Sequence, residues 1–129
     1  MKSIITIVSD DILFPNILLI LLKRKIKELE IIVCKTFQDI DEKLSSKSCD
    51  LVLLDGGMTR ISSIEIIQYI RTKQLIIAPI WFFTEIETES YIMKSKQLGA
   101  SMIISKPFDP HKVTDEIASL LLNSALINH

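Results

Sequence analysis

The chain alternates five short apolar runs with five longer amphipathic segments, and this alternation constrains the fold more than any other feature. The apolar runs are continuous, which is typical of strands buried on both faces of a parallel sheet. The predicted strands cover Ser3–Val8, Glu30–Lys35, Asp50–Leu54, Ile76–Thr84 and Ser101–Ser105. The first predicted helix carries Pro15 in its first turn, and the others cover Phe37–Ser46, Ser62–Lys73, Glu87–Leu98 and Pro110–Asn123. We therefore expect an α/β fold, a doubly wound five-stranded parallel sheet in (βα)5 order.

Length and charge limit the class of protein. A chain of 129 residues buries enough surface for one globular domain, so we expect a single domain over residues 1–129 with no output domain. Fifteen basic and 16 acidic side chains give a formal net charge of −1, which argues against nucleic acid or an anionic membrane as the main partner. The apolar stretch Ile12–Leu22 is too short to span a membrane.

The two cysteines, Cys34 and Cys49, follow no metal-ligand spacing, and a chain of this size needs no disulfide framework. This usage fits a reducing compartment. We expect a cytoplasmic protein that binds another protein or a small ligand.

Polar residues follow four of the predicted strands. In open parallel sheets, ligands collect beyond the carboxyl ends of the strands, near the point where the strand order reverses. The residues at these ends are Asp10 and Asp11 after the first strand, Asp55 after the third, Thr84 at the end of the fourth and Lys106 after the fifth. We expect three carboxylates, one hydroxyl and one ammonium group to converge there.

This set of groups predicts phosphoryl chemistry. Clustered carboxylates repel one another unless a cation neutralises them, and Mg²⁺ binds one or two carboxylates together with water and phosphate oxygens. Lys106 supplies a point charge for an anion, and the Thr84 hydroxyl donates a hydrogen bond to it. An aspartate beside Mg²⁺ is able to act as the nucleophile and form an aspartyl phosphate.

Five short motifs stand in one register along the predicted pattern. They are Val8-Ser9-Asp10-Asp11, the segment from Asp50 to Asp55, Phe82-Phe83-Thr84, Leu98-Gly99-Ala100 and Ser105-Lys106-Pro107-Phe108. In this order and spacing the chain resembles the receiver domain of two-component response regulators, the CheY-like family, over essentially its whole length. The resemblance implies a flavodoxin-like fold and a signalling module rather than an enzyme.

The resemblance also implies a role for each residue of the site. Asp55 accepts a phosphoryl group from the phosphohistidine of a sensor histidine kinase or phosphotransfer protein. Mg²⁺ is held by Asp10, with Asp11 or Ser9 beside it, by Asp55 and by the backbone carbonyl of Gly57.

On the fourth and fifth strands, the resemblance makes Thr84 the switch hydroxyl and Lys106 the phosphate-binding lysine. It makes the Lys106–Pro107 bond a cis peptide, a geometry that is common only before proline. The readout is then a contact with an unknown output protein, and a homodimer stays open.

Some residues depart from the family pattern. Met58-Thr59 and Ser62-Ser63 stand where the family has Met-Pro and Asp-Gly, although Ser62 is still able to cap a helix. Glu85 follows Thr84 where the family prefers a small residue, and Ile103 stands where many receivers carry Tyr or Phe.

Three alternative interpretations remain. Glu85 and Ile103 favour a degenerate receiver that acts as a phosphorylation-independent adaptor. Another interpretation, from a different functional class, is a small flavodoxin-like or phosphohydrolase-type enzyme. It is disfavoured because the chain lacks a glycine-rich cofactor loop. Asp10 and Asp11 also suit a turn or a helix N-cap ahead of the first helix.

Overall fold

The computed structural model describes residues 2–44, 49–58 and 61–127. Five parallel strands form one sheet in the order β2-β1-β3-β4-β5. The strands are β1 (Ser3–Val8), β2 (Leu29–Cys34), β3 (Leu51–Asp55), β4 (Ile80–Thr84) and β5 (Met102–Ser105). The helices are α1 (Leu13–Lys25), α2 (Phe37–Leu44), α3 (Ser63–Thr72), α4 (Glu89–Leu98) and α5 (Pro110–Ile127). The predicted doubly wound (βα)5 fold is confirmed.

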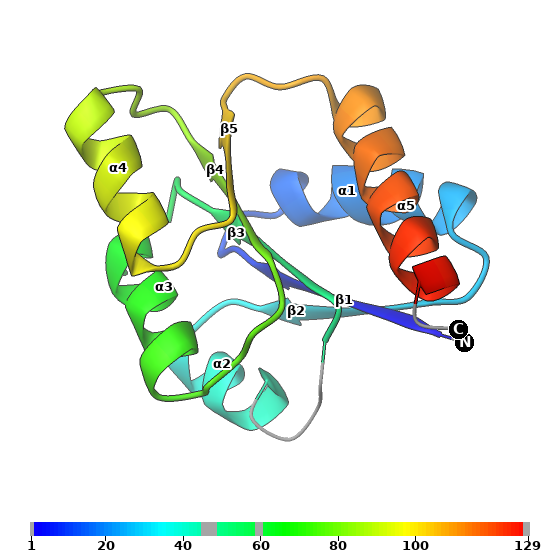
Figure 1. Cartoon of the computed structure of the whole chain (residues 1–129), viewed down its shortest axis with the longest axis horizontal. Helices are drawn as coiled ribbons and strands as arrows, with labels where there is room; N and C mark the ends of the chain where they lie inside the picture. The colour runs from blue at the N-terminus through cyan, green and yellow to red at the C-terminus, as the bar shows by residue number, and fades with distance from the viewer. Residues whose placement is uncertain (1, 45–48, 59–60, 128–129) are drawn as a thin grey trace.

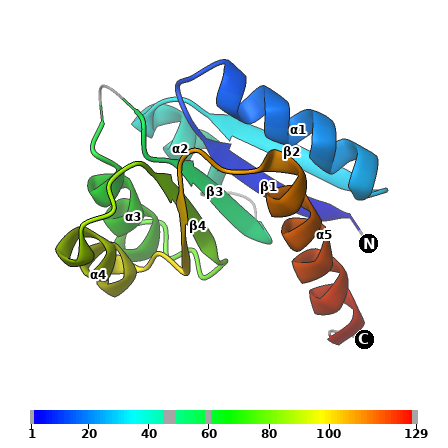
Figure 2. The ribbon, with the colours of Figure 1, turned by 90° about the horizontal axis from the view of Figure 1, so that it is seen from above.

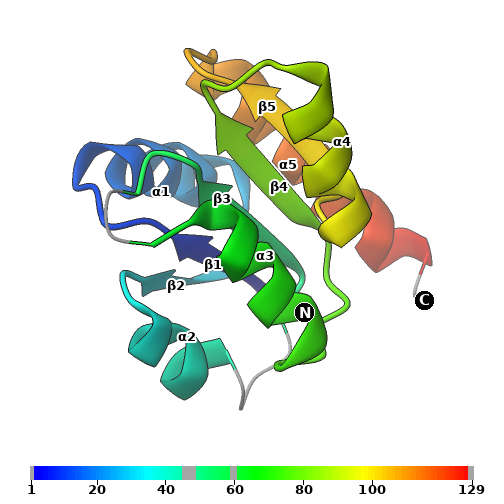
Figure 3. The same cartoon turned by 90° about the vertical axis from the view of Figure 1, so that its left-hand side faces the viewer.

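The helices form two layers, one on each face of the sheet. Helices α1 and α5 lie together on one face, and α2, α3 and α4 lie on the other (Figures 1 and 2). Figure 3 shows the arrowheads of β1, β4 and β5 pointing the same way, so the loops that follow these strands gather at one edge. The residues after the strands therefore meet in space although they are far apart in the chain.

Each central strand contributes alternate side chains to two separate cores. On the α1 and α5 face, Ile5, Leu53 and Phe83 are fully buried against both helices. On the opposite face, Leu54 and Phe82 are fully buried against α2 and α3. Burial on both faces explains why the strands read as continuous apolar runs.

Several element boundaries differ from the predicted ones. The fourth strand begins at Ile80 rather than Ile76, because the carbonyls of Ile76 and Ala78 accept hydrogen bonds from the Arg71 guanidinium at 2.7 and 2.8 Å. Ser62 occupies the N-cap of α3 with an extended backbone, but within the described residues its hydroxyl makes no capping hydrogen bond. The last helix continues to Ile127.

Two predictions fall partly outside the described ranges. The predicted second helix ends at Ser46, and the observed helix is described as far as Leu44. Thr59, one of the departures from the family pattern, also lies outside the described residues. Across the described part of the chain, none of the helices has the length and apolar character that a membrane span requires.

Candidate functional site

The candidate site lies where the strand order reverses, between β1 and β3. Asp55 ends β3 with only 2% of its surface exposed, and Ser9 follows β1 directly and is fully buried. The Ser9 hydroxyl donates a hydrogen bond of 2.7 Å to Oδ2 of Asp55. A reversal point of this kind is where open α/β sheets bind ligands, because no helix covers the ends of the two neighbouring strands.

Lys106 follows the edge strand β5 and reaches Asp55 at the same carboxyl-terminal edge of the sheet. Its backbone N–H donates to the carbonyl of Thr84 at 2.9 Å, which anchors the residue at the end of β5. The Nζ atom forms an ion pair with Oδ1 of Asp55, and the two side chains are 18% and 3% exposed. The Lys106–Pro107 peptide is cis, which confirms the expectation from the resemblance.

The two glycines after Asp55 have different structural roles. The Gly56 N–H donates to the Phe83 carbonyl at 2.7 Å, and a Cβ atom on Gly56 would lie 2.5 Å from that oxygen. The Gly57 N–H donates to Oδ1 of Asp55 at 2.9 Å. Gly56 therefore allows β4 to approach closely, whereas Gly57 helps to orient the Asp55 carboxylate.

The Thr84 hydroxyl belongs to the same edge of the sheet. Thr84 is 3% exposed, and its Oγ1 accepts a hydrogen bond of 3.0 Å from the backbone N–H of Ile86. This bond uses a lone pair of the oxygen, so the hydroxyl proton is left to donate elsewhere. Thr84 thus retains a donor that is able to serve an anion bound near Asp55.

The described residues do not bring three carboxylates together, and Asp10, Asp11 and Asp55 as metal ligands remain a prediction. Within residues 2–44, 49–58 and 61–127, no three Asp, Glu, His or Cys side chains lie close enough to hold a metal ion. Asp11 instead accepts hydrogen bonds from the N–H groups of Ile12 and Phe14, at 2.8 and 3.2 Å, at the start of α1. The reason is local, because the first N–H groups of a helix have no intrahelical partner and attract a nearby carboxylate.

Asp10 is exposed at the end of β1, next to Ser9. A magnesium ion needs only one or two protein carboxylates and completes its shell with other oxygen atoms. The carboxylates of Asp10 and Asp55 and the backbone carbonyl of Gly57 offer such a donor set. In chemical type these oxygen donors suit Mg²⁺, and the set needs no contribution from Asp11.

An open pocket of about 400 Å³ lies beside the ion pair. Asp11, Glu85 and Lys106 provide its charged lining, and much of the remainder is apolar, with Leu13 and Ile17 from α1. Glu85 is exposed and lines the same pocket as Lys106. The charged residues that line this pocket are therefore one cation and two carboxylates.

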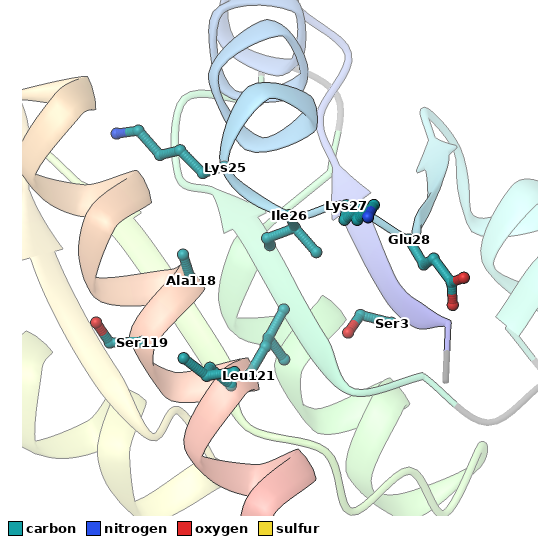
Figure 4. A pocket seen from close by; sticks show the side chains of 9 residues that line it. Ser3, Lys25, Ile26, Lys27, Glu28, Ala118, Ser119 and Leu121 are labelled. Carbon is teal, nitrogen blue, oxygen red and sulfur yellow. The ribbon is translucent and has the colours of Figure 1, made fainter.

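A second pocket, of about 590 Å³, lies at the opposite edge of the sheet, between the end of α1 and α5 (Figure 4). Ile26, Ala118 and Leu121 form its apolar part. Lys25 borders this pocket, but its ammonium group is bound to α5, with Asp115 at 2.8 Å and Thr114 at 2.6 Å. This pocket is therefore separate from the groups around Asp55.

Phe14 is a contact of the site that the sequence analysis missed. The Lys106 ammonium lies 4.9 Å from the centre of the Phe14 ring. The only sign of this contact in the sequence is an aromatic residue four positions after Asp10. Its pairing with a lysine 92 residues later depends on the three-dimensional fold.

Comparisons with known proteins agree on one family. A family model described as the response regulator receiver domain matches residues 5–118. Among curated proteins, the chain is 34% identical over 68 residues to the transcriptional regulatory protein CrdR of Helicobacter pylori, an alignment that covers 53% of this chain and 32% of that protein. It is 25% identical over 97 residues to the alkaline phosphatase synthesis transcriptional regulatory protein PhoP of Bacillus subtilis, covering 75% of this chain and 40% of that protein. The chain thus spans about a third to two fifths of the length of these relatives.

Solved structures show the same fold. The signal receiver domain of a DNA binding response regulator from Colwellia psychrerythraea has a TM-score of 0.81 and 22% identity, covering 93% of this chain and 98% of that one. The chemotaxis response regulator CheY4 of Vibrio cholerae has a TM-score of 0.76 and 19% identity, covering 93% of this chain and 99% of that one. At these identities the likeness concerns the fold alone.

Proposed function

The chain belongs to the response regulator receiver domain family, and from this membership we propose that it accepts a phosphoryl group on Asp55. The donor is the phosphohistidine of a sensor histidine kinase or a phosphotransfer protein. The observation that carries the proposal is the buried Asp55 carboxylate, paired with Lys106 at the reversal point of the sheet. Receiver domains are signalling domains, so the consequence of the transfer is a change in protein contacts rather than a released product.

The transfer makes one bond and breaks one. A carboxylate oxygen of Asp55 attacks the phosphorus atom, a P–O bond forms, and the P–N bond to the donor histidine breaks. The imidazole nitrogen keeps the electron pair. Ser9 and Gly57 hold the Asp55 carboxylate by the hydrogen bonds of 2.7 and 2.9 Å, which restricts its orientation before the donor arrives.

The charges of the site favour the phosphorylated product. The Lys106 ammonium is already beside Asp55 and pairs with the phosphoryl oxygens once they are present. The Thr84 hydroxyl supplies a neutral donor from the end of β4. Asp10, Asp55 and the Gly57 carbonyl are the ligands we assign to Mg²⁺, which when bound neutralises negative charge at the phosphoryl group.

Incubation with Mg²⁺ and acetyl phosphate, followed by intact mass and peptide mapping, tests the proposal. Wild type is expected to gain one phosphoryl group, and Asp55→Asn is expected to gain none, because an amide has nearly the same shape but is not a nucleophile of this kind. Asp50→Asn is the matched control. It makes the same change just before β3, where Asp50 accepts a hydrogen bond of 2.8 Å from the N–H of Ile4.

Two results would contradict the proposal. Labelling that persists in Asp55→Asn would place the phosphoacceptor elsewhere. Absence of labelling in wild type and in Glu85→Ala would support the adaptor interpretation, in which the fold acts without phosphorylation.

A further inference from the structure

We propose that Phe14 is a positioning residue for Lys106, because its ring face holds the lysine ammonium beside the Asp55 carboxylate. The inference rests on the proposed function, since the place of the ammonium matters only when a phosphoryl group arrives at Asp55. It goes further by assigning a role to a residue that carries no charge and no polar side-chain atom.

The geometry links three elements that are distant in the chain. Nζ of Lys106, after β5, lies 4.9 Å from the centre of the Phe14 ring, in the first turn of α1. The same atom forms the ion pair with Asp55 at the end of β3. The ammonium therefore has an aromatic face and a carboxylate as neighbours, and both attract a positive charge.

The Phe14 ring is itself held in place. Its centre lies 5.1 Å from that of Phe83 with an angle of 78° between the ring planes, and 6.1 Å from that of Phe108 with an angle of 75°. Phe14 is 7% exposed, and its backbone N–H donates to the Asp11 carboxylate. These edge-on contacts and the burial leave the ring little freedom to turn its face away from Lys106.

A lysine needs such support because its ammonium sits on a flexible stem of four carbons. The Phe14 face reduces the number of positions that Nζ occupies in the unphosphorylated protein. Because the Lys106 side chain is only 18% exposed, water screens this attraction less than at an open surface. We expect loss of the ring face to lower the rate constant for labelling of Asp55 by about three- to tenfold.

The rate constant for labelling by acetyl phosphate in Mg²⁺ tests the proposal. Phe14→Leu keeps an apolar side chain and removes the aromatic face. Phe37→Leu is the matched control, since it removes a ring that packs edge-on against Tyr69, at 5.3 Å and 70°, on the opposite face of the sheet. We expect slower labelling for Phe14→Leu and an unchanged rate for Phe37→Leu, with thermal melts to compare the stability of both variants.

A purely structural role for Phe14 is distinguished by two further measurements. Replacing Phe14 with mono-, di- and trifluorophenylalanine withdraws electrons from the ring face with little change in its size, so the rate constant should fall stepwise. In a double-mutant cycle, Phe14→Leu should have little further effect once Lys106→Ala is present, because the ring acts through the ammonium.

A third measurement needs neither metal nor phosphodonor. Protons above an aromatic face resonate upfield, so the ε-methylene protons of Lys106 should be shifted upfield in wild type and not in Phe14→Leu. A missing shift overturns the proposal, as does a rate constant that is unchanged across the fluorinated series. If wild type is not labelled at all, the proposed function fails and this role fails with it, whereas labelling at equal rates in wild type and Phe14→Leu overturns this role alone.

Discussion

A methyl group at Gly56 should destabilise the fold, although the glycine next to it should tolerate the same change. A Cβ atom at Gly56 would lie 2.5 Å from the Phe83 carbonyl oxygen and 3.2 Å from the Thr84 Cα atom, both in the backbone of β4. A Cβ atom at Gly57 would lie 3.3 Å from Oδ1 of Asp55 and 3.4 Å from Nζ of Lys106, which are ends of side chains.

The expected cost follows from what has to move. A Cβ atom at Gly56 forces β3 and β4 apart, and such overpacking costs about 1–3 kcal/mol. The separation also weakens the hydrogen bond of 2.7 Å from Gly56 to Phe83, a loss of about 1 kcal/mol. Alanine offsets about 0.5 kcal/mol of this loss, because it lowers the conformational entropy of the unfolded chain. We expect a net loss of about 2 kcal/mol for Gly56→Ala and less than about 1 kcal/mol for Gly57→Ala.

Urea unfolding is the assay. The single tryptophan, Trp81, lies in β4 with 4% of its surface exposed, so its fluorescence reports unfolding next to the altered contact. A loss of 2 kcal/mol corresponds to a fall in melting temperature of about 8 °C for a domain of this size. If Gly56→Ala unfolds within about 0.5 kcal/mol of wild type, or Gly57→Ala costs as much as Gly56→Ala, the steric argument is refuted.

Five other outcomes are expected. Arg71→Met should lower the free energy of unfolding by about 2–3 kcal/mol in urea titrations, because the Arg71 guanidinium donates to three backbone carbonyls. Burial raises the pKa of the Cys34 thiol from 9.0 to about 12, so the folded protein keeps a proton that the unfolded chain loses. Its stability should therefore fall as the pH rises from 9 to 12, and less steeply in Cys34→Ala. Millimolar Mg²⁺ should raise the melting temperature of wild type more than that of Asp10→Ala. Glu85→Ala should be phosphorylated faster, because a carboxylate that repels the phosphodonor is removed from the pocket lining, with little change in the rate of dephosphorylation. Ile86→Glu should shorten the lifetime of the phosphorylated form, because the new carboxylate positions a water molecule for hydrolysis.

The architecture was predictable because each layer of this fold leaves a local pattern. A strand buried on both faces reads as an apolar run, as in the predicted strand Ser3–Val8, which is β1 without change. The error at the fourth strand shows where a local pattern fails. Residues 76–79 are apolar enough for a strand, but two of their carbonyls accept hydrogen bonds from the Arg71 side chain instead of a neighbouring strand.

The candidate site was predictable in composition more than in arrangement. Asp55, Thr84 and Lys106 stand at the ends of their strands as expected, because parallel strands bring their carboxyl ends to one edge. The orientation of each side chain could not be predicted in the same way. Asp11 faces the start of α1, and Ser9 rather than a third carboxylate binds Asp55.

The sequence by itself determined the order of strands and helices, the edge at which polar groups gather and the chemical types available there. Those properties depend on periodicity and chain order, which are local. Tertiary structure alone decided that Phe14 lies under the Lys106 ammonium and that Gly56 must lack a side chain. Both depend on distances between segments that are distant in the sequence. Such distances are set by the packing of two cores against one sheet, so no pattern within a single segment encodes them.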